Sequence, residues 1–168
     1  MTRAPTAADA AIAVVMTVDN ATVGAQVPAR YLLCDFLREQ AGARGVHVAC
    51  GHGVCGACTV VVDAVPVRAC LMLAVQADGC VVQTIASLPA LEGAAPGDSG
   101  LTRLQRAFRD HHALQCGYCT PGMLVSTASF LAANPGPSRG QILDHLNGHL
   151  CRCSGYANII AAIESVRP

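Results

Sequence analysis

The 168-residue sequence contains no lysine and no tryptophan, and only 13% of its residues are charged. Eleven acidic residues balance eleven arginines, so the net charge is zero. Without a basic excess, binding to nucleic acid or to an anionic membrane is excluded as the main task of the chain. An aromatic content of 4% also excludes stacking platforms for bases. Because an average domain has about 25% charged residues, we expect partner subunits to cover part of the surface.

No apolar run in the sequence has the form of a membrane span or a secretory signal. The stretch 113–138 carries no charge, but residues such as Pro121 and Pro135 interrupt it. A spanning helix needs about 20 consecutive apolar residues. The apolar N-terminal stretch is broken by Asp9 and is too short for a signal peptide. We therefore expect a cytoplasmic protein with no membrane contact.

Hydrophobic patterning divides the chain into a strand-rich half and a helical half, which predicts an α+β fold. In the first half a helix is predicted at 30–40, and strands are predicted at 12–18, 22–27, 46–48, 59–62, 65–67 and 81–85. In the second half helices are predicted at 101–108, 123–133, 138–150 and 159–166. Thr120 is the predicted N-cap of the second of these helices, followed by Pro121 at its first position. Ser138 and Gln141 form a predicted capping box for the third.

The stretch 89–100 holds two prolines and three glycines, which is typical of a linker. We therefore expect a disordered lead over 1–10, a first domain over 11–88, a linker over 89–100 and a second domain over 101–168. Four helices with short connections predict that the second domain is a small bundle.

Four of the ten cysteines form the first motif. The spacing is C-x4-C-x2-C with a fourth cysteine after eleven residues, and the members are Cys50, Cys55, Cys58 and Cys70. This is the plant-type pattern for a [2Fe–2S] cluster, whose two irons need two thiolates each. Gly51, Gly53 and Gly56 allow the positive φ angles of a tightly wrapped loop. The alternatives to an iron–sulfur cluster are a zinc site, a disulfide or buried structural cysteines, and the complete motif favours the cluster. Because four cysteines already supply every ligand, His52 is interpreted as a loop residue and not as a ligand.

Four further cysteines form a second motif, each pair of which stands where a predicted helix begins. The members are Cys116, Cys119, Cys151 and Cys153. The N-terminus of a helix offers free N–H donors and the positive end of the dipole, which favours an anionic group. C-x2-C with a distant C-x-C also fits zinc, so from the spacing alone iron–sulfur and zinc both stay open. The presence of the first motif favours iron–sulfur at the second site, because an electron carrier can use a second redox centre.

Together these motifs resemble the small iron–sulfur subunit of the molybdenum hydroxylases, the family of xanthine dehydrogenase and aldehyde oxidoreductase. The matching segments are Cys50 to Thr59 with Cys70, Gln115 to Met123, and Leu150 to Tyr156. The resemblance implies a plant-ferredoxin-like β-grasp domain followed by a four-helix domain, each with one [2Fe–2S] cluster. It also implies an electron-transfer subunit of a molybdenum-dependent oxidoreductase, with no substrate site on this chain.

The family further implies two partner subunits and a direction of electron flow. A large subunit holds molybdopterin, expected in a dinucleotide form, and hydroxylates the substrate. Electrons then pass through the helical-domain cluster and the ferredoxin-like cluster to FAD on a medium subunit, in a dimer of heterotrimers. The expected substrates are N-heteroaromatic compounds, purines or aldehydes, with N-heteroaromatic compounds favoured.

The resemblance also assigns individual residues. The ligands of the cluster nearer molybdenum correspond to Cys116, Cys119, Cys151 and Cys153, and those of the cluster nearer flavin to Cys50, Cys55, Cys58 and Cys70. Gln115 corresponds to a glutamine that hydrogen-bonds the pterin, and the sulfur of Cys153 lies beside the pterin in this family. The family often has glycine at the position of Ala64, where a type I′ turn with alanine is strained.

The cysteine motifs also allow two other functions, and four further cysteine and histidine residues lie outside the motifs. The alternatives are a free-standing ferredoxin-type carrier and a ferredoxin-like domain with a structural zinc module. Cys34 and Cys80 are interpreted as structural cysteines. His145 and His149, four residues apart on one helix face, are a possible zinc pair but are interpreted as surface or interface residues.

Overall fold

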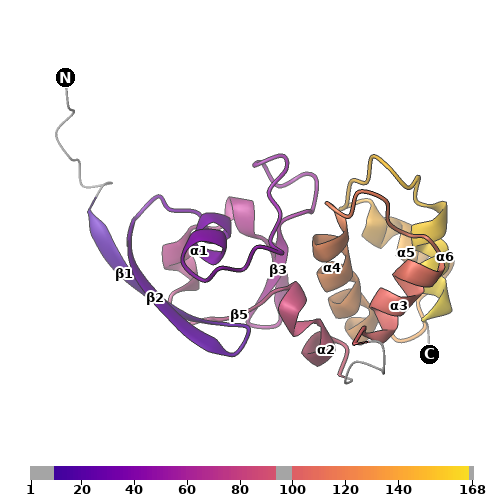
Figure 1. Cartoon of the computed structure of the whole chain (residues 1–168), viewed down its shortest axis with the longest axis horizontal. Coiled ribbons are helices and arrows are strands. Elements are labelled where there is room, and N and C mark those ends of the chain that lie inside the picture. Colours follow the sequence, from indigo (N-terminus) through magenta and orange to yellow (C-terminus); the bar gives the residue numbers. More distant parts are fainter. Residues whose placement is uncertain (1–9, 94–99, 167–168) are drawn as a thin grey trace.

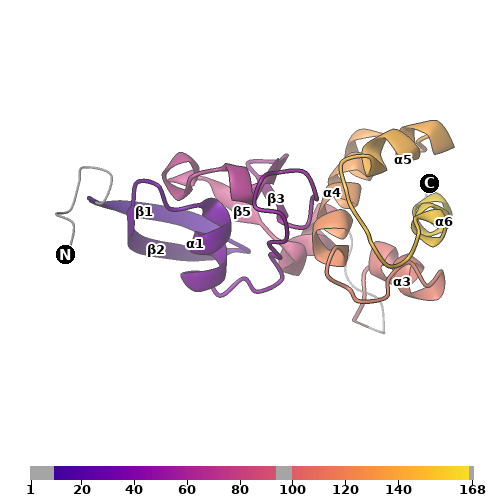
Figure 2. The same cartoon turned by 90° about the horizontal axis from the view of Figure 1, so that it is seen from above.

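The computed structural model describes residues 10–93 and 100–166. A sheet-containing half and a helical half lie end to end, with helix α4 (Thr120–Ala133) against strand β3 (Thr59–Val62) (Figures 1 and 2). The expected α+β order of strands followed by helices is confirmed. The expected disordered lead lies, apart from residue 10, outside the described residues.

One five-stranded mixed sheet forms the first half, in the order β2-β1-β5-β3-β4. The remaining strands are β1 (Ala11–Val18), β2 (Ala21–Pro28), β4 (Val65–Arg68) and β5 (Val81–Gln83). β1 pairs in parallel with β5, whereas the β1–β2, β3–β4 and β3–β5 pairs are antiparallel. The strand predicted at 46–48 is wrong: this short segment has no pairing partner in the sheet and approaches the first cysteine loop as irregular chain.

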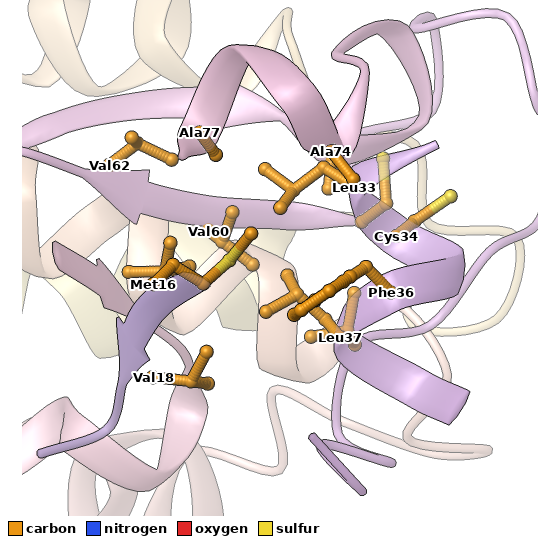
Figure 3. Packing of buried hydrophobic residues seen from close by; sticks show 14 of the residues in the cluster. Met16, Val18, Leu33, Cys34, Phe36, Leu37, Val60, Val62, Ala74 and Ala77 are labelled. Carbon is orange, nitrogen blue, oxygen red and sulfur yellow. The ribbon is translucent and has the colours of Figure 1, made fainter. Parts of the chain in front are cut away.

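Helix α1 (Leu33–Glu39) covers one face of the sheet. Phe36 and Leu37 point from the helix toward Met16 and Val60 of the strands, and all four side chains are buried (Figure 3). The helix begins three residues later than predicted, because Leu32 makes an isolated antiparallel bridge with Leu73 before the helix starts. The buried strand and helix faces therefore build one hydrophobic core.

The second half consists of α4 together with α3 (Arg103–Asp110), α5 (Arg139–Leu146) and α6 (Ala157–Ser165). The predicted capping box of Ser138 and Gln141 is confirmed, and a second capping box, which was not predicted, joins Thr102 and Gln105. The N-cap prediction at Thr120 is wrong, because Cys119 is the N-cap residue and α4 already includes Thr120. The helices share a separate hydrophobic core.

The first residues of the predicted linker 89–100 are helical. Residues 88–91 form a short helix, α2 (Leu88–Leu91), with Pro89 in its first turn, where proline is well tolerated. Leu88 is fully buried in the core of the helical half, which is why this segment is ordered. The centre of the predicted linker, 94–99, lies outside the described residues.

The low charge of the sequence predicts contacts with partner subunits, but the central part of the uncharged stretch 113–138 is covered by this chain itself. Residues 122–128 of α4 are buried within the chain itself. One side of the helix contributes Met123 and Leu124 to the helical core, while the opposite side packs on β3. All four residues of β3 are also buried. Because both faces of β3 and both sides of α4 are covered, the sequence of each element is a nearly continuous apolar run.

In the part of the chain that the structure describes, no helix combines the length and the apolar character that crossing a membrane requires.

The turn between β3 and β4 contains a strained alanine. Asp63 and Ala64 have φ angles of 44° and 67°, the left-handed region that a type I′ turn demands. This conformation costs an L-residue roughly 1–2 kcal/mol. Replacement of Ala64 by glycine should therefore raise the free energy of unfolding by about 1 kcal/mol, measured by chemical denaturation of the full chain.

Ala25 in the middle of β2 provides the control, because it lies outside the residues with positive φ. There the same change to glycine should lower stability by about 0.5–1 kcal/mol. Equal effects at both positions would contradict strain at Ala64.

Candidate metal centres

The first four cysteines meet where the loop before β3 approaches a 3-10 turn, η2 (Ala69–Leu71). Cys50, Cys55 and Cys58 lie on the loop and Cys70 lies in the turn. The backbone N–H of Cys55 points at the sulfur of Cys50 at 3.5 Å, and the thiols of Cys58 and Cys70 interact directly. The predicted positive φ angles of the three loop glycines are confirmed at 70–82°.

Gly56 is needed for close approach as well as for its backbone conformation. A Cβ on Gly56 would lie 2.4 Å from Nδ1 of His149 and 2.7 Å from the carbonyl oxygen of Gly148. A Cβ on Gly122, in the first turn of α4, would lie 2.4 Å from the carbonyl oxygen of Gly56. The first cysteine loop is therefore packed directly against the helical half.

The second four cysteines meet at the N-terminal ends of α4 and α6, as predicted. The sulfur atoms of Cys116 and Cys153 lie 3.4 Å apart, and the thiols of Cys119 and Cys151 interact directly. Ser154, the residue after the C-x-C pair, places its hydroxyl 3.1 Å and its backbone N–H 3.5 Å from the sulfur of Cys151. Each set thus consists of two pairs of thiols.

This pairing fits the chemistry of a [2Fe–2S] cluster, in which each of the two irons takes two thiolates. Within residues 10–93 and 100–166, no group of three His, Cys, Asp or Glu side chains is close enough together to hold a single metal ion. A cavity of about 550 Å³ opens between the second set and the first loop, lined by Cys55 and Ala57 and by all four cysteines of the second set. The residues around this cavity fit a sulfur-ligated group bound between the ends of α4 and α6.

The thiols differ in how readily they ionise. The backbone N–H of Cys55 lowers the pKa of Cys50 to about 6, and the N–H of Tyr118 also lowers the pKa of Cys116. Burial raises the pKa of Cys58 to about 11 and that of Cys119 to about 12. Since thiolates ligate metal, filling either site must release protons from the buried thiols.

Among the hydrogen bonds that cross the boundary between the halves, two have donors that directly adjoin a cysteine of the second set. The backbone N–H of Leu150 donates to the carbonyl oxygen of Cys55 at 2.9 Å. The hydroxyl of Tyr118 donates to the carbonyl oxygen of Val48 at 2.8 Å, and its ring stacks on His47. Both donors adjoin a cysteine of the second set, and the acceptors lie in or just before the first loop.

Tyr156 anchors the C-x-C segment in a similar way. Its hydroxyl accepts from the backbone N–H of Cys151 at 2.9 Å and donates to the carbonyl oxygen of His149 at 3.0 Å. Neither role was predicted from the sequence for Tyr118 or Tyr156. The signal was present, because two of the three tyrosines stand inside or beside cysteine motifs.

Comparison with known proteins matches both halves to models of [2Fe–2S] domains. The first, described as "2Fe-2S iron-sulfur cluster binding domain", matches residues 16–81, and the second, "[2Fe-2S] binding domain", matches residues 90–164. The gamma subunit of caffeine dehydrogenase from Pseudomonas sp. strain CBB1 is 46% identical over 156 residues, covering 91% of this chain and 89% of the relative. The chain belongs to the family of small iron–sulfur subunits of the molybdenum hydroxylases. The expectation of two [2Fe–2S] clusters is thereby confirmed.

Other relatives support the same family assignment for this small subunit. The small subunit of nicotine 6-hydroxylase from Paenarthrobacter nicotinovorans is 45% identical over 137 residues, covering 82% of this chain and 78% of the relative. Among solved structures, a chain of quinoline 2-oxidoreductase from Pseudomonas putida 86 is 44% identical, with a TM-score of 0.84. That match covers 93% of this chain and 92% of the other. The fold of the small subunit is therefore shared over nearly its whole length.

The remaining candidate residues of the small subunit lie in different surroundings. Gln115, Cys116 and Cys153 are exposed at the open side of the second set. Cys34 is buried in the core of the first half, and burial raises the pKa of its thiol to about 12. Cys80 is half-buried and packs against the same core, and its backbone makes hydrogen bonds with Thr17 and Ala77. These surroundings match the structural role predicted for Cys34 and Cys80.

His145 lies in α5, whereas His149 lies beyond the end of that helix, so the predicted shared helix face is wrong. His149 lies at the boundary between the halves and is 2% exposed, so the surface alternative is wrong for it. The His145 ring stacks on Phe130 at a centroid distance of 4.4 Å. Burial, and secondarily the charge of Arg68, lowers the pKa of His145 to about 4.

The low pKa of His145 predicts acid sensitivity. Its pKa rises to about 6.5 in the unfolded chain, so between about pH 6.5 and 4 the unfolded state binds a proton that the folded state does not. Stability must therefore be lost as the pH falls through this window. The variant His145→Gln should lose less stability than the parent chain between pH 7.5 and 4.5, measured by urea denaturation at both values.

His52, which is exposed, provides the matched control. The variant His52→Gln should follow the parent chain at both pH values. A His145→Gln variant that is as acid-sensitive as the parent would contradict a buried neutral His145.

Proposed function

We propose that this chain is the electron-transfer subunit of a heteromeric molybdenum hydroxylase and binds one [2Fe–2S] cluster in each half. The hydrogen bond from Leu150 to Cys55 carries this proposal, because it joins the residue before Cys151 directly to a cysteine of the other set. Each cluster accepts and releases one electron at a time. The chain's own task is to hold the two cysteine sets in contact and to shield the first set from water.

The proposed ligands are Cys50, Cys55, Cys58 and Cys70 for the first cluster and Cys116, Cys119, Cys151 and Cys153 for the second. The pairing of the thiols supports this assignment, since each pair offers two thiolates to one iron. Shared packing of α3, α4, α5 and α6 around one core supports a four-helix bundle for the second half. For the domain limits we propose 11–87 and 88–166, since Leu88 belongs to the helical core.

The exposed side of the second set supports a large partner subunit holding a molybdopterin dinucleotide. Cys116 and Cys153 are exposed there, and apolar side chains stand beside them: Leu114 is 39% exposed and Leu150 53%. An apolar surface around a redox centre is suited to a permanent interface. We propose that electrons enter here, cross to the first set and leave to FAD on a medium subunit, in a cytoplasmic dimer of heterotrimers.

For the substrate of the complex we propose an N-heteroaromatic compound. Caffeine, nicotine and quinoline appear in the names of relatives that are 44–46% identical to this chain, and all three contain a nitrogen heteroaromatic ring. Relatives named for aldehydes are 35–39% identical. Identification of the large subunit that copurifies with this chain, followed by turnover of quinoline, caffeine and a simple aldehyde, tests the choice.

Metal analysis tests the cluster proposal. Two [2Fe–2S] clusters require about four irons per chain and no zinc. In the variant Cys58→Ser the iron content should fall to about two per chain, since the second set is untouched. Cys34→Ala removes another buried thiol of the same core and should leave about four. Two irons with one zinc in the parent chain would support the structural zinc alternative and overturn the proposal.

Gln115 tests the contact with the large subunit. Because its side chain is exposed beside Cys116, Gln115→Ala should leave the iron content unchanged while lowering turnover of the complex by about fivefold, the equivalent of one hydrogen bond of about 1 kcal/mol. Gln26, exposed on β2 far along the sheet, is the control, and its change to alanine should affect neither quantity. Iron loss in the Gln115 variant would refute the proposed pterin contact.

A further inference from the structure

Arg68, the last residue of β4, places its guanidinium group between the two cysteine sets. Its register partner in the sheet is Thr59, which directly follows Cys58. The guanidinium donates to the Thr59 hydroxyl and, at 2.5 Å, to the carbonyl oxygen of Gly148. The Thr59 hydroxyl donates in turn to the carbonyl oxygen of Gly56 at 2.6 Å. One side chain therefore connects the first cysteine loop to the segment that leads into Cys151.

The positive charge of Arg68 is not neutralised by a carboxylate in residues 10–93 and 100–166. Its field is felt across the boundary, because it contributes to the lowered pKa of both His145 and His149. An imidazole is neutral or positively charged, so neither histidine compensates the charge of Arg68. A half-buried cation that has no anionic partner in the described chain points to negative groups elsewhere nearby.

Two [2Fe–2S] clusters would supply such negative charge, since each would carry four thiolates. Arg68 lies two residues from Cys70, and its acceptor Gly148 lies three residues from Cys151. We propose that Arg68 is a positioning residue for electron transfer between the two clusters: it fixes their relative position and favours the reduced state of each. This inference rests on the proposed function, because it requires a cluster in each half.

The arrangement has two separable parts, the hydrogen bond and the charge. A Cβ on Gly148 would lie 2.9 Å from the Nη2 atom of Arg68. Gly148 has no positive φ, so alanine meets no backbone strain there. The variant Gly148→Ala therefore displaces the guanidinium from its carbonyl while keeping the charge, whereas Arg68→Met removes both. Arg38 offers a matched control, because its guanidinium donates to two carbonyl oxygens, those of Arg44 and Val46, within the first half.

The test uses the full chain, purified with its accompanying subunits. Iron content is determined, cluster reduction potentials are measured by redox titration, and the magnetic splitting between the two reduced clusters is recorded by electron paramagnetic resonance. In Arg68→Met both potentials should shift to more negative values and the splitting should decrease. In Gly148→Ala the splitting should decrease while the potentials shift less. Arg38→Met should match the parent in every readout.

The outcomes separate this inference from the proposed function. A parent chain without iron refutes the proposed function and this inference with it. Four irons in Arg68→Met with parental potentials and splitting overturn the inference alone, even if the variant is less stable, because a merely structural role lowers stability only. Should Arg68→Met lose iron, Gly148→Ala decides: a decreased splitting supports the inference and a parental splitting overturns it.

Discussion

The close contact between the first cysteine loop and the segment 148–151 is the constraint on which the rest of the structure depends. A hydrogen bond between Leu150 and Cys55 joins the two segments, and Gly56 allows the loop to approach the backbone of Gly148. Electron transfer needs redox centres held close together, and two independent halves would vary in separation. The interface turns two common cysteine motifs into one continuous unit.

The contact between the two halves requires that α4, which packs on β3, carries no charged residues. Strand β3 is buried on both faces because α1 lies on one side and α4 on the other. Charged residues on α4 would have to be desolvated against the sheet, at a cost of several kcal/mol each when unpaired. The absence of charge over this helix therefore serves contact within the chain. Leu114 and Leu150, beside the second set, are apolar residues that no part of the described chain covers.

Local patterns predicted much of the fold from the sequence. Alternation in β1, the apolar run of β3 and the capping box at Ser138 each depend on neighbouring residues, and each appears in the structure. The errors lie where tertiary contacts override local preference. The helix α2 forms inside a proline- and glycine-rich stretch because Leu88 enters the helical core, and α1 begins late because Leu32 pairs with Leu73.

The sequence by itself determined the two cysteine motifs, their order and the family, because iron–sulfur ligation requires particular residues at particular spacings. Only the tertiary structure decided how the motifs meet. Arg68, Tyr118 and His149 lie far from their contacts along the chain, and nothing in their sequence neighbourhoods specifies a partner. Which residues face one another across the two halves follows from the packing of α4 on β3, and that packing is settled by the whole fold.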